Sequence, residues 1–338
     1  MSVPSDTQTL CWVLTDGTVG MRIQCLGLAD AAGLTPLIKR IHPSWLLRAV
    51  PQAGRWPGVP ATAGGDPIAA PWPDVVISCG RRTAGAALAV RRLASRDGAV
   101  PFLAHIQDPR IDPAHFDMLI VPEHDPARGP NVVTTVGALN PQAPEKLREA
   151  ARPWLTETAD LPRPLVAVNV GGSNKRYDFS PDAVARFVED LKRLAQNSGG
   201  SLLVACSRRT DDATREALRA GLADVPGIVW TGKGENPYLA FLHLSDALVV
   251  TSDSVNMVSE ALATGKPVHI ATVEPESGRL AAFHARLREA GYTRPFAGRL
   301  DAWSYAPLTE TARVGALLAE RLAAHVGGSP DRAGGSER

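Results

Sequence analysis

The sequence has few cysteines, and none of them lies in a disulfide or metal-ligand pattern. Cys11, Cys25, Cys79 and Cys206 are scattered, with no CxxC pair and no histidine nearby at ligand spacing. This distribution excludes a disulfide framework and a zinc site, and it predicts reduced, mostly buried thiols. Reduced thiols are typical of cytosolic proteins, so we expect a cytoplasmic location.

An excess of charge and long apolar runs are also missing. The 36 Lys and Arg residues nearly balance the 35 Asp and Glu residues, so the net charge is +1 and no nucleic-acid partner is expected. The longest apolar runs, such as Ala247–Val250, are far too short to span a membrane, which leaves only peripheral membrane contact open. Met1 to Thr9 lack the features of a signal peptide, and the Gly-, Ser- and Arg-rich tail 327–338 is expected to be disordered.

Motifs of several common enzyme classes are absent. The sequence contains no GxxxxGK[ST] loop, no GxGxxG fingerprint, no HExxH and no GxSxG. A P-loop kinase, a dinucleotide-dependent dehydrogenase, a zinc protease and an α/β-hydrolase are therefore not expected. No Asp-x-Asp pair follows a predicted strand either, so we expect neither an obligatory metal ion nor a cofactor.

Short apolar runs alternate with helical patterns, which favours parallel sheets built from βαβ units. The predicted strands of the first half are Cys11–Leu14, Val75–Ser78, Phe102–Ile106, Met118–Val121 and Val132–Thr135. After a Pro-rich stretch, 152–164, which has the composition of a linker, come strands Leu165–Val170, Leu202–Ala205, Ile228–Trp230, Ala247–Val250 and Val268–Ile270. We expect one Rossmann-like domain over 1–155 and a second over 156–326, with the last helix packing back toward the first domain.

A repeated strand end supports two related domains. Residues 75–83 read VVISCGRRT and residues 202–210 read LLVACSRRT, each an apolar strand ending in Cys-x-Arg-Arg-Thr. Open parallel sheets place ligands outside the carboxyl ends of their strands, and two such sheets facing one another form an interdomain cleft. The predicted fold class is α/β and GT-B-like, with two facing Rossmann-like domains.

Polar residues of the second half gather in the turns that follow its strands. Glycines let a backbone approach a ligand closely, turn amides face anions, and Arg makes bidentate contacts with phosphate. The candidate binding residues in these turns are Gly171, Gly172, Ser173, Lys175, Ser207, Arg208, Arg209, Gly234, Glu235 and Asn236. Each group by itself is also consistent with an ordinary solvated turn.

The stretch 251–267, TSDSVNMVSEALATGKP, is the sharpest signal in the chain. Its first residues are typical of a helix start directly after a strand, where free amides and the helix dipole favour a diphosphate. The candidate binding residues here are Ser252, Asp253, Ser254, Asn256 and Glu260. A helix beginning near Asp253 places Asp253, Asn256 and Glu260 on one face, where Glu260 would accept hydrogen bonds from ribose hydroxyls. The alternative is a capped core helix whose Glu260 is merely solvated.

This stretch resembles the donor-binding segment of GT-B glycosyltransferases, where a Ser/Thr-rich helix start precedes a Glu and a Gly-x-Pro turn. The chain as a whole is similar to a narrower family, the bacterial and plant proteins named for mitochondrial fission ("elongated mitochondria"). The matching stretches include LTDGTVGMRIQCLGLA, HIQDPRIDPAHFD, GGSNKRYDF and TSDSVNMVSEALATGKPV, and they run from Leu14 to Leu308. The resemblance implies glycosyl transfer, while the sequence contains no mitochondrial presequence.

The first half carries the candidates for acceptor binding and base chemistry. Asp16, Asp108 and His124 each follow a predicted strand. An inverting transfer needs one such group to take the proton of the acceptor hydroxyl, and the spacing does not distinguish among the three.

The function predicted from the sequence is a metal-independent glycosyltransferase that uses a nucleotide-diphosphate sugar and an unknown acceptor. Two alternatives stay open. One is a non-catalytic binding protein that keeps the fold as a scaffold for a protein partner, and the other is a sugar-nucleotide epimerase on the same fold.

Overall fold

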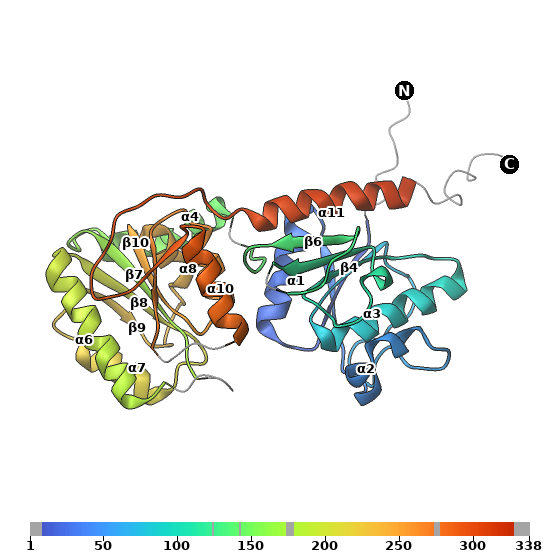
Figure 1. Cartoon of the computed structure of the whole chain (residues 1–338), viewed down its shortest axis with the longest axis horizontal. Coiled ribbons are helices and arrows are strands. Elements are labelled where there is room, and N and C mark those ends of the chain that lie inside the picture. The colour runs from blue at the N-terminus through green and yellow to red at the C-terminus, as the bar shows by residue number, and fades with distance from the viewer. Residues whose placement is uncertain (1–8, 124, 142, 174–178, 274–277, 328–338) are drawn as a thin grey trace, which may run out of the picture. The chain divides into compact units, whose positions relative to one another are not determined.

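Two parallel β-sheets, each of six strands, organise the chain (Figure 1). The structure is a computed structural model that describes residues 9–123, 125–141, 143–173, 179–273 and 278–327. The chain divides into unit 1, Met1–Pro141 with Thr309–Arg338, and unit 2, Gln142–Leu308. The predicted α/β fold class with parallel sheets is confirmed.

The sheet of unit 1 has the strand order β2-β1-β3-β4-β5-β6. Its strands are β1 (Cys11–Thr15), β2 (Pro36–Arg40), β3 (Val75–Cys79), β4 (Phe102–Ile106), β5 (Met118–Pro122) and β6 (Val132–Thr135). Its helices are α1 (Val19–Ala31), α2 (Trp45–Ala49), α3 (Arg81–Ala94) and α11 (Glu310–Gly327), with 3-10 turns η1 (Pro51–Arg55), η2 (Ser95–Asp97) and η3 (Pro113–His115). Strand β2 was not predicted, because it is an edge strand whose side chains are half-buried or exposed.

The two faces of this sheet are covered by different helices, as strand alternation requires. On one face Cys11 and Val13 pack with α1 and α11 in a core that includes Leu318. On the other face Trp12 and Leu14 pack with the alanine-rich α3. Figure 1 shows α11 running along the sheet of unit 1 beside α1.

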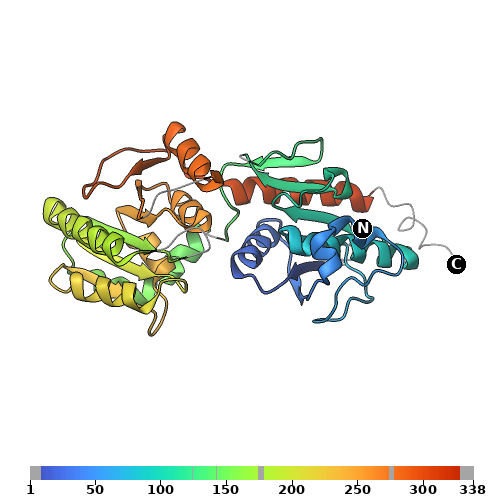
Figure 2. The same ribbon diagram turned by 60° about the horizontal axis from the view of Figure 1, so that its bottom comes forward.

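The sheet of unit 2 has the strand order β12-β11-β10-β7-β8-β9. Its strands are β7 (Leu165–Val170), β8 (Ser201–Cys206), β9 (Gly227–Trp230), β10 (Ala247–Thr251), β11 (Val268–Ala271) and β12 (Thr293–Pro295). Its helices are α4 (Pro144–Ala151), α5 (Leu155–Thr158), α6 (Pro181–Ser198), α7 (Asp212–Gly221), α8 (Tyr238–Leu244), α9 (Val255–Leu262) and α10 (Gly278–Glu289), with the 3-10 turn η4 (Arg152–Trp154). Helices α6 and α7 lie side by side on the face that Val166, Val168 and Val170 present (Figure 2).

Unit 2 begins at Gln142, earlier than the expected domain boundary after residue 155. Helix α4 packs on α8, and the ring of Trp154 lies edge-on to that of Phe241 with 5.6 Å between centroids. The stretch 152–164, which we had expected to be a linker, therefore belongs to unit 2, where the ring of Trp154 contacts α8. Within the described ranges, no helix is long and apolar enough to cross a membrane.

Each sheet has one point at which the strand order changes direction. In unit 1 this point lies between β1 and β3, and in unit 2 it lies between β7 and β10. The connections that leave two such neighbouring strands run to opposite sides, which opens a crevice at the carboxyl ends of the strands where α/β proteins bind ligands. We therefore expect the functional side chains to lie at these two switch points.

Candidate functional site

The switch point of unit 2 brings together the segments that follow β7 and β10. The two strands pair in parallel, with Asn169 opposite Val250, so the segments that follow them leave the sheet at the same edge, its carboxyl end. The amide of Gly171 donates to Thr251 Oγ1 at 2.8 Å, and the Thr251 hydroxyl donates to Asp253 Oδ1 at 2.6 Å. The sequence predicted both turns, and the strand order makes them neighbours.

Glycine is required at this junction because the segments approach too closely for a side chain. A Cβ atom on Gly171 would lie 2.1 Å from both carboxylate oxygens of Asp253, and one on Gly172 would lie 2.0 Å from the carbonyl oxygen of Arg209. The Gly172 amide donates to Asp253 Oδ2 at 3.2 Å. Packing between segments therefore explains both glycines, in addition to any approach by a ligand.

Arg209 and Asp253 form the central ion pair of this edge. Arg209 Nη2 donates to Asp253 Oδ2 at 2.6 Å, and Nη1 donates to the carbonyl of Gly172 at 3.2 Å. The Asp253 side chain is completely buried, which is tolerable because its oxygens accept hydrogen bonds from several donors. These two predicted binding residues are thus engaged in holding the turns together.

Arg208, which directly precedes Arg209 in the chain, has a different environment. It is exposed, and among the described residues its guanidinium makes no ion pair or hydrogen bond. Ser207 is internally bonded, since its Oγ lies 3.2 Å from Thr210 Oγ1 and accepts from the Arg209 amide at 3.2 Å. At the end of β8, Arg208 is therefore the cation available to a ligand.

Arg215 is a residue of this edge that the sequence analysis missed. From α7 its Nε donates to the carbonyl of Thr210 at 2.8 Å and its Nη2 to the carbonyl of Ser207 at 2.9 Å. It also donates to the carbonyl of Thr231, which follows β9. Arg215 thereby joins the turns after β8 and β9, and its position inside an amphipathic helix gave no signal of this role.

Helix α9 begins at Val255, later than the predicted start near Asp253. Ser254 is its N-cap, and its Oγ accepts from the Met257 amide at 3.4 Å. Asp253 therefore precedes the helix and does not share a face with Asn256, which lies half-buried in the first turn. The expectation of a three-residue helix face was wrong, because Asp253 lies in the turn between β10 and the N-cap Ser254, where its carboxylate is bonded to Thr251.

Glu260 is buried, with 6% of its surface exposed, so it is not the solvated carboxylate of the alternative interpretation. The phenol of Tyr238, at the start of α8, donates to Glu260 Oε2. Burial and the neighbouring Glu260 charge raise the pKa of Tyr238 well above its ordinary value, so the phenol keeps its proton and remains a donor. Tyr238 thus holds the Glu260 carboxylate in place.

The loop before α8 carries the other predicted residues. Gly234, Glu235 and Asn236 are exposed, and Asn236 Oδ1 accepts from the Tyr238 amide at 3.0 Å. Gly234 has a positive φ of 77°, a conformation that favours glycine. The loop is therefore connected to Glu260 through Tyr238, a link between two sequence motifs that only the fold reveals.

The remaining candidates of unit 2 lie at the edges of this arrangement. Ser252 is buried and its carbonyl accepts from His284 Nε2 at 2.8 Å. Ser173 Oγ accepts from the Phe179 amide at 3.0 Å. Lys175 lies outside the described residues.

At the switch point of unit 1, Asp16 follows β1 and meets Arg82, which follows β3. The Thr18 amide donates to Asp16 Oδ1 at 2.9 Å, and Arg82 Nη1 lies 3.4 Å from Oδ2. Burial raises the pKa of Asp16, but the hydrogen bonds from Thr18 and the Arg82 charge outweigh it and hold the pKa below its ordinary value. Asp16 is accordingly ionised at neutral pH and is a weak base.

The other two base candidates differ in what the structure shows. Asp108 is half-buried after β4, and its Oδ1 accepts from the Arg110 amide at 2.7 Å. Gln107 and Arg110 have positive φ angles of 70° and 59°, so this turn is backbone-strained, as functional turns often are. His124 lies outside the described residues. Within the described ranges, no group of three His, Cys, Asp or Glu side chains is placed to hold a metal ion.

Comparison with known proteins gives a family match and two curated relatives. The model of the family described as Mitochondrial fission ELM1 matches residues 19–322. The chain is 36% identical over 279 residues to the Mitochondrial fission protein ELM1 of Arabidopsis thaliana, a match of 75% of this chain and 64% of that protein. It is 26% identical over 284 residues to Uncharacterized protein RP120 of Rickettsia prowazekii, a match of 73% of this chain and 79% of that protein. The chain thus spans less than two thirds of the plant relative's length.

Solved structures share the fold at low sequence identity. The UDP-GlcNAc 2-epimerase of Methanocaldococcus jannaschii superposes with a TM-score of 0.55 at 13% identity, over 92% of this chain and 99% of that one. The UDP-GlcNAc 2-epimerase of Neisseria meningitidis, solved bound to UDP-GlcNAc, superposes with a TM-score of 0.50 at 13% identity, over 94% of this chain and 99% of that one. Likeness at this identity shows the fold alone, which is GT-B-like.

Proposed function

Because the chain belongs to the Mitochondrial fission ELM1 family and has a GT-B-like fold, we propose that it is a metal-independent glycosyltransferase that uses a nucleotide-diphosphate sugar. The observation that carries the proposal is the edge of unit 2 at the β7/β10 switch point. There an unpaired cation, a capped helix start and an oriented carboxylate follow neighbouring strands. The diphosphate of such a donor matches the cation and the helix start, and its ribose matches the carboxylate.

The diphosphate would be bound at the strand ends by Arg208 and the start of α9. Arg208 has no ion pair among the described residues, so binding a phosphate costs it no existing partner. Ser254 caps α9, and the helix dipole at this start favours negative charge. The Arg209–Asp253 ion pair holds together the turns after β7, β8 and β10 on which this site is built.

The nucleoside would be bound next to Glu260 and the loop Gly234–Asn236. Tyr238 donates to Glu260 Oε2 and so fixes the orientation of the carboxylate, which would accept from a ribose hydroxyl. The exposed loop residues supply polar groups for the base. Unit 1 would bind the acceptor, with Asp16, Asp108 or His124 taking the proton of its hydroxyl as that oxygen attacks the anomeric carbon.

The decisive experiment is a thermal-shift screen against UDP-, GDP-, ADP-, CMP- and dTDP-sugars, followed by calorimetric titration of the best ligand. At a hundredfold excess over the dissociation constant, a ligand should stabilise the protein by about 2.7 kcal/mol. Arg208→Gln should weaken that ligand by about 1.5–3 kcal/mol, the worth of a hydrogen bond to a charged group. Arg219→Gln is the matched control, because Arg219 is an exposed arginine of unit 2 on α7.

Product analysis separates the alternatives. If incubation with a nucleotide sugar alone produces its C2 epimer, the protein is an epimerase, the activity named for the two structural neighbours. If no nucleotide sugar binds at millimolar concentration, the glycosyltransferase proposal fails, and the non-catalytic binding protein becomes the leading hypothesis, which a pull-down of partners would test.

A further inference from the structure

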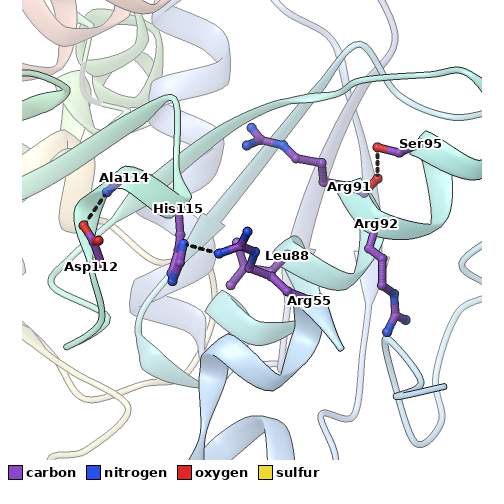
Figure 3. A pocket seen from close by; sticks show the side chains of 8 residues that line it. All are labelled: Arg55, Leu88, Arg91, Arg92, Ser95, Asp112, Ala114 and His115. Carbon is purple, nitrogen blue, oxygen red and sulfur yellow. Dashed lines mark hydrogen bonds between the residues drawn. The ribbon is translucent and has the colours of Figure 1, made fainter. Parts of the chain in front are cut away.

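A cavity of about 540 Å³ lies in unit 1, away from the strand ends described above (Figure 3). It is open on one side and is lined by residues of the second half of α3, of η1 and of the segment around η3. Because η3 directly precedes β5, and α3 runs back from the end of β3, the cavity lies toward the amino ends of the parallel strands. Asp16 and Asp108, by contrast, follow the carboxyl ends, so the cavity is separate from the candidate site.

The walls of the cavity carry more positive than negative charge. Its lining includes Arg55, Arg91, Arg92 and His115 but a single carboxylate, Asp112. Arg91 is neutralised by an ion pair with Asp117, outside the lining. After this ion pair is set aside, Arg55 and Arg92 still outnumber Asp112, so the lining has a net positive charge.

The other two guanidinium groups have no carboxylate partner within the described part of the chain. Arg92 donates to the backbone carbonyls of Trp56 and Val59. Arg55 Nη1 donates to His115 Nδ1 at 3.0 Å, and Figure 3 shows these two side chains pointing toward one another beside Leu88. An arginine that donates to an imidazole needs that ring neutral, so two groups able to bind an anion are bonded to each other.

Burial and the nearby Arg55 charge both act on the pKa of two groups that line the cavity. Burial, followed by the Arg55 charge, lowers the pKa of His115, and the Asp112 charge opposes this only in part. Burial also lowers the pKa of Arg91. The neighbouring Asp117 raises this pKa, and the Arg55 charge lowers it. A bound anion would relieve these repulsions.

We propose that this cavity is a second ligand site, which binds the phosphate group of a phosphomonoester. Arg55 provides the planar fork that suits phosphate oxygens, and His115 provides an N–H donor once the ring turns or takes up a proton. Asp112 accepts from the Ala114 amide at 2.9 Å and stands at the cavity wall, where it can accept from a hydroxyl of the same ligand. The volume is that of a small-molecule pocket, larger than the ion by itself needs.

The shared chemistry is a phosphomonoester, which is carried both by free metabolites and by the headgroup of phosphatidic acid. Three probes distinguish the sources: inorganic phosphate, glycerol 3-phosphate, and phosphatidylcholine vesicles with or without phosphatidic acid. Calorimetry of the full chain measures the two soluble probes, and co-sedimentation measures the vesicles. A free-metabolite site binds glycerol 3-phosphate without requiring a membrane, and a headgroup site binds only the phosphatidic acid vesicles.

The variant that tests the site is Arg55→Gln, because the only hydrogen bond of Arg55 among the described residues is the one to His115. We expect it to weaken the binding probe about tenfold or more, as the loss of a charge-assisted hydrogen bond does. Arg48→Gln is the control, since Arg48 is an exposed arginine on the neighbouring α2 and does not line the cavity.

His115→Gln gives a second, independent test that does not change the charge of Arg55. It should weaken the same probe, while the melting temperature of each variant without ligand reports whether folding is intact. Equal weakening by Arg55→Gln and Arg48→Gln would mean that only general charge attraction is measured and would overturn the proposal. Failure of all three probes to bind the wild type would overturn it as well. Binding lost in Arg208→Gln but kept in Arg55→Gln would assign the phosphate to unit 2 instead.

Discussion

Asp253 is completely buried, and Arg209 closes over it with 2.6 Å between Nη2 and Oδ2, while 40% of the arginine side chain stays exposed. The pair joins residues 44 apart in the sequence and ties the turns after β7, β8 and β10 to each other. A buried carboxylate with several donors is costly to disturb, because each donor loses its acceptor. The pair is therefore the structural foundation of the proposed donor site.

Removing the Asp253 carboxylate should destabilise the protein. Asp253→Ala is expected to lower the free energy of unfolding by about 3 kcal/mol, since Arg209 and the Gly172 amide then lack their acceptor. Urea unfolding followed by circular dichroism measures this. Arg208→Gln is the comparison and should stay within about 0.5 kcal/mol of wild type, as an exposed arginine does. Equal stabilities for the two variants would contradict the assignment of Asp253 as a structural residue.

Gly171→Ala should be disruptive for a steric reason. The added Cβ would lie 2.1 Å from the Asp253 carboxylate oxygens, so the turn must shift, at a cost of about 1–3 kcal/mol. Gly327→Ala is the matched control, because a Cβ at the end of α11 meets no atom within 4 Å. The two melting temperatures, compared with that of wild type, check the prediction; a fully stable Gly171→Ala protein would rule it out.

Glu260→Gln should separate ligand binding from folding. The amide oxygen of Gln still accepts from Tyr238, so stability should change little, whereas a ribose hydroxyl loses a charged acceptor. Affinity for the nucleotide ligand should then fall by about 1.5–3 kcal/mol. Calorimetric titration measures it, and Glu216→Gln, an exposed glutamate on α7, is the control. Unchanged affinity would show that Glu260 serves only to bond Tyr238.

The base in unit 1 can be identified by single-turnover transfer with Asp16→Asn, Asp108→Asn and His124→Ala. The variant that removes the base should slow transfer on the order of 100-fold or more, with little change in nucleotide affinity. The pH profile gives a further distinction. If Asp16 is the base, activity should persist as pH falls below the ordinary range of Asp, because its pKa is lowered. Full activity in all three variants would exclude them all.

Lys266 should make stability depend on pH in the alkaline range. Burial lowers its pKa to about 8, while its ammonium donates to the Leu242 carbonyl at 2.8 Å. Between about 8 and the unfolded value of about 10.4, the unfolded chain binds more protons than the folded one, so stability rises with pH across this window. Below this pH window Lys266 is protonated in both the folded and the unfolded state, so it contributes nothing to the change of stability with pH.

The measurement is urea unfolding at several pH values for wild type and Lys266→Met. The variant should lack the part of the rise that Lys266 contributes. Lys192→Met, a lysine on the surface helix α6, should follow wild type. Parallel curves for wild type and Lys266→Met would contradict the lowered pKa.

Much of the fold follows from local sequence rules. Period-two apolar runs such as Val166, Val168 and Val170 predict buried strands, and their alternation with helices predicts parallel sheets. Ser180 and Ser254 are of the residue type that commonly begins helices, and both cap helices in the structure. These features depend on residues a few positions apart, so the sequence determined them directly.

The roles of individual site residues were decided by tertiary structure. Arg208 and Arg209 are indistinguishable in the sequence, yet one pairs with a buried carboxylate and the other faces solvent. Tyr238 and Glu260 belong to separate motifs, and a hydrogen bond between α8 and α9 joins them in the structure. Contacts of this kind depend on strand order, which places the segment after β7 beside the one after β10. The sequence by itself determined the buried strands and the turns that carry polar groups. Which of those groups meet was decided by the fold, because only the assembled sheet sets the distances between segments far apart in the chain.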